Sequence, residues 1–161
     1  VQATSAEQML SSIARGAEFR ASGKTNMNDA SSRSHAILSV VISDGGFEDG
    51  TVMYLVDLAG SERVKRSGVQ VGSKGFTEAA SINGALSALG RVVVGLVERD
   101  GQRAAHIPYK DNLLTELLKS GLGGNSKTAL ICCITAANDS MDESLNTLRF
   151  ALQASHVKNQ V

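Results

Sequence analysis

The sequence predicts an α/β fold in which helices cover both faces of a central sheet, and it predicts that this sheet is incomplete. Apolar residues make up 42% and charged residues 20% of the 161-residue chain, a mixture typical of one globular domain. Helix-like and strand-like segments alternate along the chain, which favours a three-layer α/β/α arrangement. Three segments are convincing strands, fewer than sheets of this kind ordinarily contain.

The first helix is expected over residues 4–22. Thr4 to Glu7 has the T-x-x-E pattern of a capping box, and apolar residues follow at helical spacing. Residues 23–35 are small and polar, which indicates a loop. The apolar residues of the helix are Met9, Leu10, Ile13, Ala17 and Phe19.

A β-hairpin and a long loop are expected next. Residues 36–43 and 51–57 are β-branched and apolar, as strands are, and Asp44 to Gly50 is rich in turn residues. Residues 58–75 hold four glycines, several charges and no clear period. Long loops in compact domains are usually functional or mobile, so this loop is a candidate for function.

The second half predicts two helices before its strand. Apolar residues step by three or four over residues 76–98, which indicates a long amphipathic helix. Pro108 and Asp111 begin a short helix that ends in a glycine-rich turn. The short helix carries a stripe of leucines at Leu113, Leu114, Leu117 and Leu118.

A buried strand and a final helix complete the predicted elements. The strand is expected over residues 128–135 and contains Cys132 and Cys133. Neighbouring cysteines seldom pair, so buried, reduced thiols in a cytosolic protein are expected. Ser140 to Glu143 offers a second capping box for a helix that continues to about residue 156.

Bulk composition argues against several classes of partner. Sixteen basic and sixteen acidic residues cancel, which gives no indication of a nucleic-acid partner. The sequence has no apolar run of about 18 residues and no signal peptide, so no membrane is expected. The absence of an initiating Met indicates that the chain starts within a longer protein.

The segment Val56 to Glu62 is the sharpest candidate for chemistry. An apolar strand ends in Asp57, and Gly60 follows three residues later. In phosphate-hydrolysing switch proteins such an Asp holds Mg²⁺, directly or through water, and the Gly lets a backbone N–H approach a γ-phosphate. D-x-x-G alone is weak, since strands often end in Asp and turns often contain Gly.

The segment Asn28 to His35, just before the first strand, is the second candidate. Its clustered hydroxyls could ligate Mg²⁺ or orient water, and Arg33 could pair with an acid. The alternative is a polar loop with local side-chain hydrogen bonds, which Ser and Asn favour in any case.

Together, in this order, the two segments resemble the switch I and switch II motifs of the kinesin motor domain. The resemblance continues over nearly the whole chain. Further segments that match are Ile82-Asn83, Leu86 to Gly90, His106 to Asp111, Leu122 to Thr128 and Thr147 to Ala151.

The resemblance implies an incomplete kinesin-like P-loop NTPase fold, with residues 1–161 forming the C-terminal half of a motor domain. It implies a parent ATPase that uses ATP and Mg²⁺ and works on microtubules (tubulin) in the cytoplasm, as part of the cytoskeleton. A coiled coil elsewhere in the parent is also implied.

The resemblance also implies roles for individual residues. Ser32 and Asp57 would hold Mg²⁺, with Asp57 acting through water, and Asn83 would tie the long helix to switch II. Arg33 and Glu62 would form a salt bridge that closes the two switches. The nucleotide contacts would come from Asn28, Ser31, Ser32, Asp57 and Gly60, and the catalytic set would be Ser31, Ser32, Arg33, Gly60 and Glu62.

The surface expected to bind the microtubule departs from the family pattern. Leu113 and Glu116 stand where the family usually has basic residues. Residues 76–119 hold five basic and five acidic residues, so this region is neutral. Weak microtubule binding, or a binding mode that differs from that of processive transport kinesins, is expected. The candidate microtubule contacts are Lys65, Arg66, Lys74, Arg91, Tyr109 and Lys110.

The phosphate-binding loop of the family is not found. Gly23-Lys24-Thr25 resembles the end of G-x-x-x-x-G-K-[ST], but Glu18 stands where the first Gly belongs. The chain alone is therefore expected to be inactive, and its missing partner would be the N-terminal half of the motor domain. A non-hydrolysing, kinesin-related tubulin-binding or scaffolding module is the alternative. A G-protein-like GTPase would rest on D-x-x-G alone, since no N-K-x-D motif is present.

Overall fold

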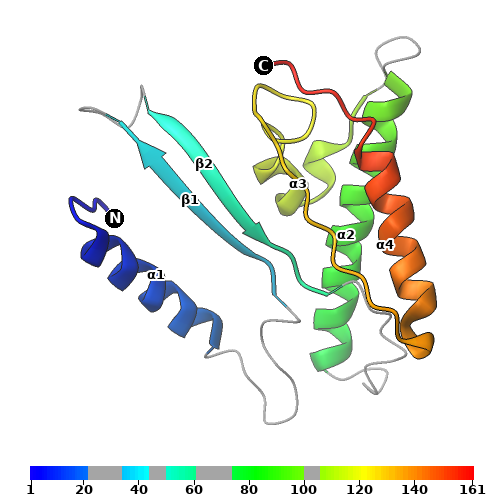
Figure 1. The fold of residues 1–161 in the computed structure, drawn as a ribbon, viewed down its shortest axis with the longest axis horizontal. Coiled ribbons are helices and arrows are strands. Elements are labelled where there is room, and N and C mark those ends of the chain that lie inside the picture. The colour runs from blue at the N-terminus through cyan, green and yellow to red at the C-terminus, as the bar shows by residue number, and fades with distance from the viewer. Residues whose placement is uncertain (22–33, 44–49, 61–73, 100–105) are drawn as a thin grey trace. The chain divides into compact units, whose positions relative to one another are not determined.

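The computed structural model describes residues 1–21, 34–43, 50–60, 74–99 and 106–161 (Figure 1). The chain divides into two compact units, Val1–Gly60 and Ser61–Val161. The first unit holds a helix and a β-hairpin, and the described part of the second is helical.

The helix of the first unit is α1, Ala6–Ala21, close to its predicted bounds. Its cap differs from the prediction by one residue. The Ser5 hydroxyl accepts the Gln8 backbone N–H at 3.3 Å, and the Gln8 side chain reaches back to the Thr4 N–H at 2.9 Å. Glu7 is thus not the capping partner, because Ser5 and Gln8 also have the spacing that a capping box needs.

The predicted hairpin is confirmed. Strands β1, Ala36–Ile42, and β2, Thr51–Asp57, pair antiparallel. Gly50 leads into β2, where a Cβ would come within 2.6 Å of a Val41 methyl group, so this position requires glycine. The intervening residues 44–49 lie outside the described part.

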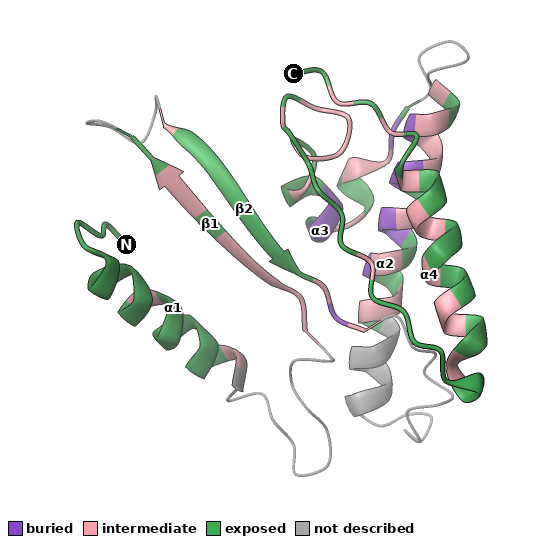
Figure 2. Cartoon of the chain, in the orientation of Figure 1, coloured by how far each residue is buried: buried purple, intermediate pink, exposed green. Residues whose placement is uncertain are grey.

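The apolar side chains of the hairpin remain accessible. Every residue of β2 is exposed, and exposure continues along most of α1 (Figure 2). The large exposed apolar residues of β2 are Val52, Met53, Tyr54, Leu55 and Val56. Apolar residues on both faces of a strand are typical of strands inside a layered sheet.

The core of the second unit forms around the long helix α2, Lys74–Arg99, which contains the predicted segment 76–98. Val92 and Leu96 pack with Ile107, and three partly buried side chains surround this cluster. These three are Tyr109, Leu122 and Val157. Residues far apart in the sequence therefore share one small core.

Helix α2 contains the single stretch, among the described residues, that is long and apolar enough to cross a membrane. This stretch is Ser81–Arg99, and 33% of it is buried inside the protein. Its buried side chains pack against neighbouring elements of the unit, as those of a core helix do.

The remaining helices are short, apart from the last. A 3₁₀ turn, η3, covers Tyr109–Asp111, and α3 covers Leu113–Leu117 with the Asn112 side chain capping the Leu114 N–H. A second 3₁₀ turn, η4, Asn138–Ser140, precedes α4, Met141–Ala154. Of the predicted leucine stripe, Leu114 is buried, whereas Leu113 and Leu117 are 70% and 47% exposed.

The predicted strand over residues 128–135 is not observed. A strand needs a ladder partner, and the described residues provide none for this segment. Its end is held by a helix instead: the Thr135 N–H donates to the Ser144 hydroxyl, which donates to the Thr135 carbonyl.

Two further expectations fail in the same region. Cys132 is half-buried and Cys133 is exposed, because no sheet covers them in the described structure. The second capping box is also wrong: Ser140 makes no side-chain cap and donates to Asp139 instead.

Candidate functional site

The register of the hairpin brings the two predicted motif segments to the same end of the hairpin. Ala36, the first residue of β1, pairs with Asp57, the last residue of β2. Residues just before β1 and just after β2 therefore leave the sheet at the same end. Ser34 and His35 come from the first motif, and Asp57 to Gly60 from the second.

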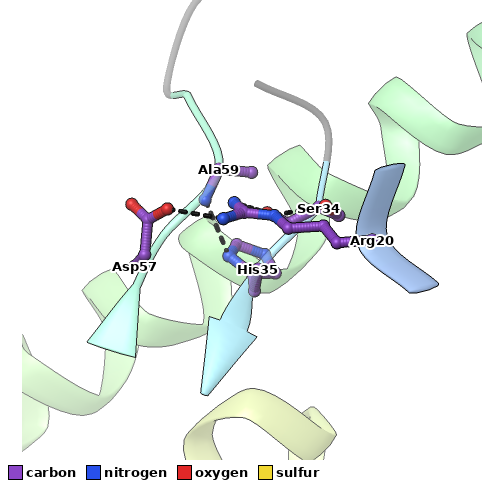
Figure 3. Close-up of polar contacts among 5 residues, drawn as sticks. All are labelled: Arg20, Ser34, His35, Asp57 and Ala59. Atoms are coloured by element: carbon purple, nitrogen blue, oxygen red, sulfur yellow. Dashed lines mark hydrogen bonds and ion pairs between the residues drawn. The ribbon is translucent and has the colours of Figure 1, made fainter. Parts of the chain in front are cut away.

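Arg20, in the last turn of α1, joins these two chain segments (Figure 3). Its Nη1 lies 2.7 Å from the Asp57 Oδ2, its Nε donates to the Ser34 hydroxyl at 3.1 Å, and its Nη2 donates to the Ser34 carbonyl at 2.8 Å. The Arg20 side chain is 23% exposed and that of Asp57 is 68% exposed. A forked guanidinium suits this arrangement because it presents several donors in fixed directions.

His35 provides a second link between the segments. The Ala59 backbone N–H donates to the His35 Nδ1 at 3.1 Å (Figure 3). Because Nδ1 accepts here, the neutral ring carries its proton on Nε2. Burial, and secondly the nearby Arg20 charge, lower the pKa of His35 below its usual 6.5, which favours this neutral form.

The other ring nitrogen of His35, Nε2, differs from Nδ1. This atom is buried and has no hydrogen-bond partner in the described part of the chain. In the described part of the chain, the polar contact of the His35 ring is therefore the hydrogen bond that Nδ1 accepts from Ala59.

Some of the predicted site residues lie in the described part of the chain, and others lie outside it. Asp57 and Gly60 lie at the end of the hairpin just described, and Gly60 is half-buried. Seven others fall outside the described residues: Asn28, Ser31, Ser32, Arg33, Glu62, Lys65 and Arg66. Lys74 begins α2.

Sequence reasoning missed Arg20 and the role of His35. Arg20 is one of several charged residues on an exposed helix, and its contacts span 14 and 37 residues of sequence. No local pattern could identify such a partner. His35 stood inside the motif, but nothing in its spacing indicated which atom it binds.

The predicted microtubule contacts of the second unit are partly engaged within the chain. Arg91 lies with its Nη2 3.3 Å from the Asp111 Oδ2, and both side chains are about half exposed. The Tyr109 hydroxyl donates to the Leu122 carbonyl, and Lys119 lies 5.7 Å from the Tyr109 ring centroid. Lys110 is exposed.

Tyr109 is accordingly a packing residue as well as a surface one. It contacts the core around Val92 and Leu96. Burial raises its pKa above the usual 10.0, and the Arg99 charge opposes that rise. The part of Tyr109 that could meet a partner is therefore limited.

The C-terminal segment is held by the side chain of Asn159. Its Oδ1 accepts the Gly123 N–H at 2.8 Å, and its Nδ2 lies 2.6 Å from the Ser126 carbonyl. The same nitrogen approaches the Gly121 carbonyl and the Thr128 hydroxyl, each at 3.1 Å. One amide thus organises the turn between α3 and the segment that follows.

Of the two predicted metal ligands, Asp57 at the end of β2 lies in the described part of the chain and Ser32 lies outside it. Within the described ranges, no three His, Cys, Asp or Glu side chains are grouped closely enough to cage a metal. Mg²⁺ ordinarily keeps several waters and takes one or two oxygen ligands from the protein. The exposed Asp57 carboxylate at a strand end fits that habit.

Comparisons with known proteins agree along the chain. The family model of the kinesin motor domain matches residues 1–157. The chain is 43% identical over 169 residues to Kinesin-like protein KIN-4C of Arabidopsis thaliana, covering 96% of this chain and 13% of that protein. It is 40% identical to Kinesin-like protein KIN-1 of the same organism, covering 94% of this chain and 33% of that protein.

Solved structures show the same likeness. A fast kinesin is 38% identical with a TM-score of 0.79, covering 99% of this chain and 45% of that one. A KIF14 dimer, bound to a microtubule with AMP-PNP, is 38% identical with a TM-score of 0.83, covering 98% of this chain and 45% of that one. The chain therefore spans less than half the length of each of these proteins.

Proposed function

Because this chain belongs to the kinesin motor-domain family and has part of the kinesin P-loop NTPase fold, we propose that it is the switch-bearing and microtubule-binding part of an ATP-hydrolysing motor. The parent protein would hydrolyse ATP with Mg²⁺ on microtubules. The chain by itself would be inactive, since it lacks a phosphate-binding loop.

The observation that carries this proposal is that the two motif segments meet at one end of the hairpin. Arg20 binds both Asp57 and Ser34, and His35 binds Ala59. Ser32 is two residues from Ser34, a span of at most about 7 Å of chain. In the proposal, the hydroxyls of the first motif would therefore lie near the carboxylate and the glycine of the second.

Each group at this end of the hairpin has a specific task in the proposal. Asp57 would orient a water of the Mg²⁺ shell, and Ser31 and Ser32 would contact the metal, the γ-phosphate and the attacking water. Mg²⁺ supplies charge neutralisation on the phosphate oxygens. The Gly60 N–H would donate to the γ-phosphate, and Asn28 would contact the nucleotide.

Closure of the two loops would signal that a γ-phosphate is present. Arg33 and Glu62 would pair when both loops are in place, so their pairing couples phosphate occupancy to loop order. Asn83, half-buried on α2, would pass this change to the helix. The microtubule would then be met by Lys65, Arg66, Lys74, Arg91, Tyr109 and Lys110.

The exposed faces of the hairpin support a second part of the proposal. An upstream half of the motor domain would cover β2 and the segment 128–135, and would supply the phosphate cradle. Leu130, Ile131 and Ile134 lie in a segment that forms no strand in the described structure, and they are 49%, 88% and 55% exposed. This apolar surface is available for another part of the protein to cover. The parent would act in the cytoplasm, on the cytoskeleton, and carry a coiled coil.

Microtubule-stimulated ATP hydrolysis by the full-length gene product tests the proposal. Gly60→Ala should abolish stimulation, because a Cβ there would keep the backbone from the phosphate. Gly16→Ala is the matched control, since a Cβ at that helical position meets nothing within 4 Å. Equal rates for both variants, or no stimulation of the wild-type protein, would contradict the proposal.

A further inference from the structure

We propose that His35 is a positioning residue for the phosphate-sensing backbone: its Nδ1 holds the Ala59 amide and thereby sets the direction of the Gly60 N–H. This inference rests on the proposed function for its consequence in catalysis. Its structural content rests on the hydrogen bond between Ala59 and His35.

The geometry leaves the Gly60 amide little freedom once Ala59 is held. Peptide units are planar, so a single φ/ψ pair, that of Ala59, separates the Ala59 N–H from the Gly60 N–H. Ala59 is 4% exposed, which restricts its movement further. Two residues earlier, Arg20 anchors the Asp57 carboxylate. The turn is therefore fixed at two points just before Gly60.

The chemistry of the contact selects the neutral Nε2–H tautomer of the ring. Only an unprotonated Nδ1 can accept the Ala59 N–H. Among the described residues at this end of the hairpin, the Arg20 guanidinium and the Asp57 carboxylate pair with each other. An Asn side chain offers an acceptor oxygen at the position that Nδ1 occupies, whereas Leu offers none.

This contact joins the two motifs differently from the proposed Arg33–Glu62 pair. His35 directly follows the residues of the first motif, and Ala59 directly precedes Gly60. The bond is made by a neutral acceptor and by backbone. Neither partner is a group to which the proposal assigns a nucleotide contact, so the bond would orient the Gly60 donor independently of the phosphate, as preorganised donors do in stabilising a transition state.

Amide hydrogen exchange of the full-length gene product tests the positioning role without nucleotide. His35→Leu should speed exchange at Ala59 by about fivefold, the loss expected for one net hydrogen bond. His35→Asn should stay within about twofold of the wild type, because it restores an acceptor. Unchanged exchange in a folded His35→Leu protein would overturn the proposal.

Nitrogen NMR of the wild-type imidazole keeps the proposal testable if His35→Leu fails to fold. The neutral ring should show an unprotonated Nδ1 and a protonated Nε2. A ring with its proton on Nδ1 could not accept from Ala59, and that result would also overturn the proposal.

Steady-state kinetics separate positioning from a general structural role. His35→Leu should lower kcat by roughly tenfold and leave KM for ATP within about twofold, because the Gly60 donor matters most as charge develops. His35→Asn should recover most of kcat. A wild-type protein without ATPase activity would instead refute the proposed function, and the exchange result would still decide the role of His35.

Discussion

Arg20 and Asp57 form an ion pair of 2.7 Å across 37 residues of sequence. The pair ties the end of α1 to the end of β2, and the same guanidinium also binds Ser34. One side chain thus holds together the helix, the residues before β1 and the residues after β2.

Replacing Arg20 should destabilise the first unit. Arg20→Leu removes an ion pair and two hydrogen bonds, and we expect a loss of about 1–2 kcal/mol after discounting for the exposed carboxylate. Arg20→Lys should recover part of this, since an ammonium lacks the guanidinium fork. Urea unfolding measures the effect, and exposed Arg15→Leu on the same helix is the control. Similar midpoints for Arg15→Leu and Arg20→Leu would contradict the expectation.

Stability should fall in mild acid because of His35. Its pKa in the folded protein lies below the unfolded value of 6.5, so the unfolded chain binds the proton more readily. The contribution is fully present above about pH 6.5 and is lost as pH falls through the folded pKa. Unfolding midpoints at pH 7.5 and 5.5 should therefore converge in His35→Asn. The exposed His156→Asn should keep the wild-type slope, and a similar flattening there would exclude His35 as the cause.

Releasing Arg91 should strengthen binding to microtubules. Asp111 holds the Arg91 guanidinium at 3.3 Å in a half-exposed pair. Removing the Asp111 charge would free this cation on a surface that is proposed to bind through its basic residues. Asp111→Asn should raise affinity by about two- to threefold at low salt, an effect that screening removes at high salt. Co-sedimentation across a salt series gives the measurement. Asp142→Asn, on α4, controls for total charge, and an equal gain there would show that the Arg91 contact is irrelevant.

Removing the Asn159 side chain should loosen the turn after α3. Asn159→Ala leaves the Gly123 N–H and the Ser126 carbonyl without their partner. We expect a loss of about 2 kcal/mol in unfolding free energy, since several half-buried groups are affected at once. Asn146→Ala, exposed on α4, should cost little. A loss as large in the Asn146 variant would refute the assignment.

The helices and the hairpin could be predicted from the sequence because their signals are local. Apolar spacing gave α2 nearly to its bounds, and turn residues between two β-branched runs gave β1 and β2. The segment 128–135 failed because a strand depends on a partner that its own residues do not specify. The cap of α1 was displaced by one residue because Thr4 and Ser5 both offer suitable spacings.

The position of Asp57 at the end of a strand, with Gly60 three residues later, was predictable from the sequence, whereas the roles of both residues remain predictions. Arg20 was not predictable, because its three contacts depend on how distant segments meet. The roles predicted for Ser31, Ser32, Arg33 and Glu62 remain predictions, since these residues lie outside the described part of the chain.

The bare hairpin has a consequence for handling the protein. In the described structure β1 and β2 pair with each other alone, so each has an outer edge of backbone donors and acceptors, beside apolar side chains. Such edges are templates on which further strands can add from neighbouring molecules. Concentrated solutions of the isolated chain should therefore tend to precipitate as β-rich aggregates.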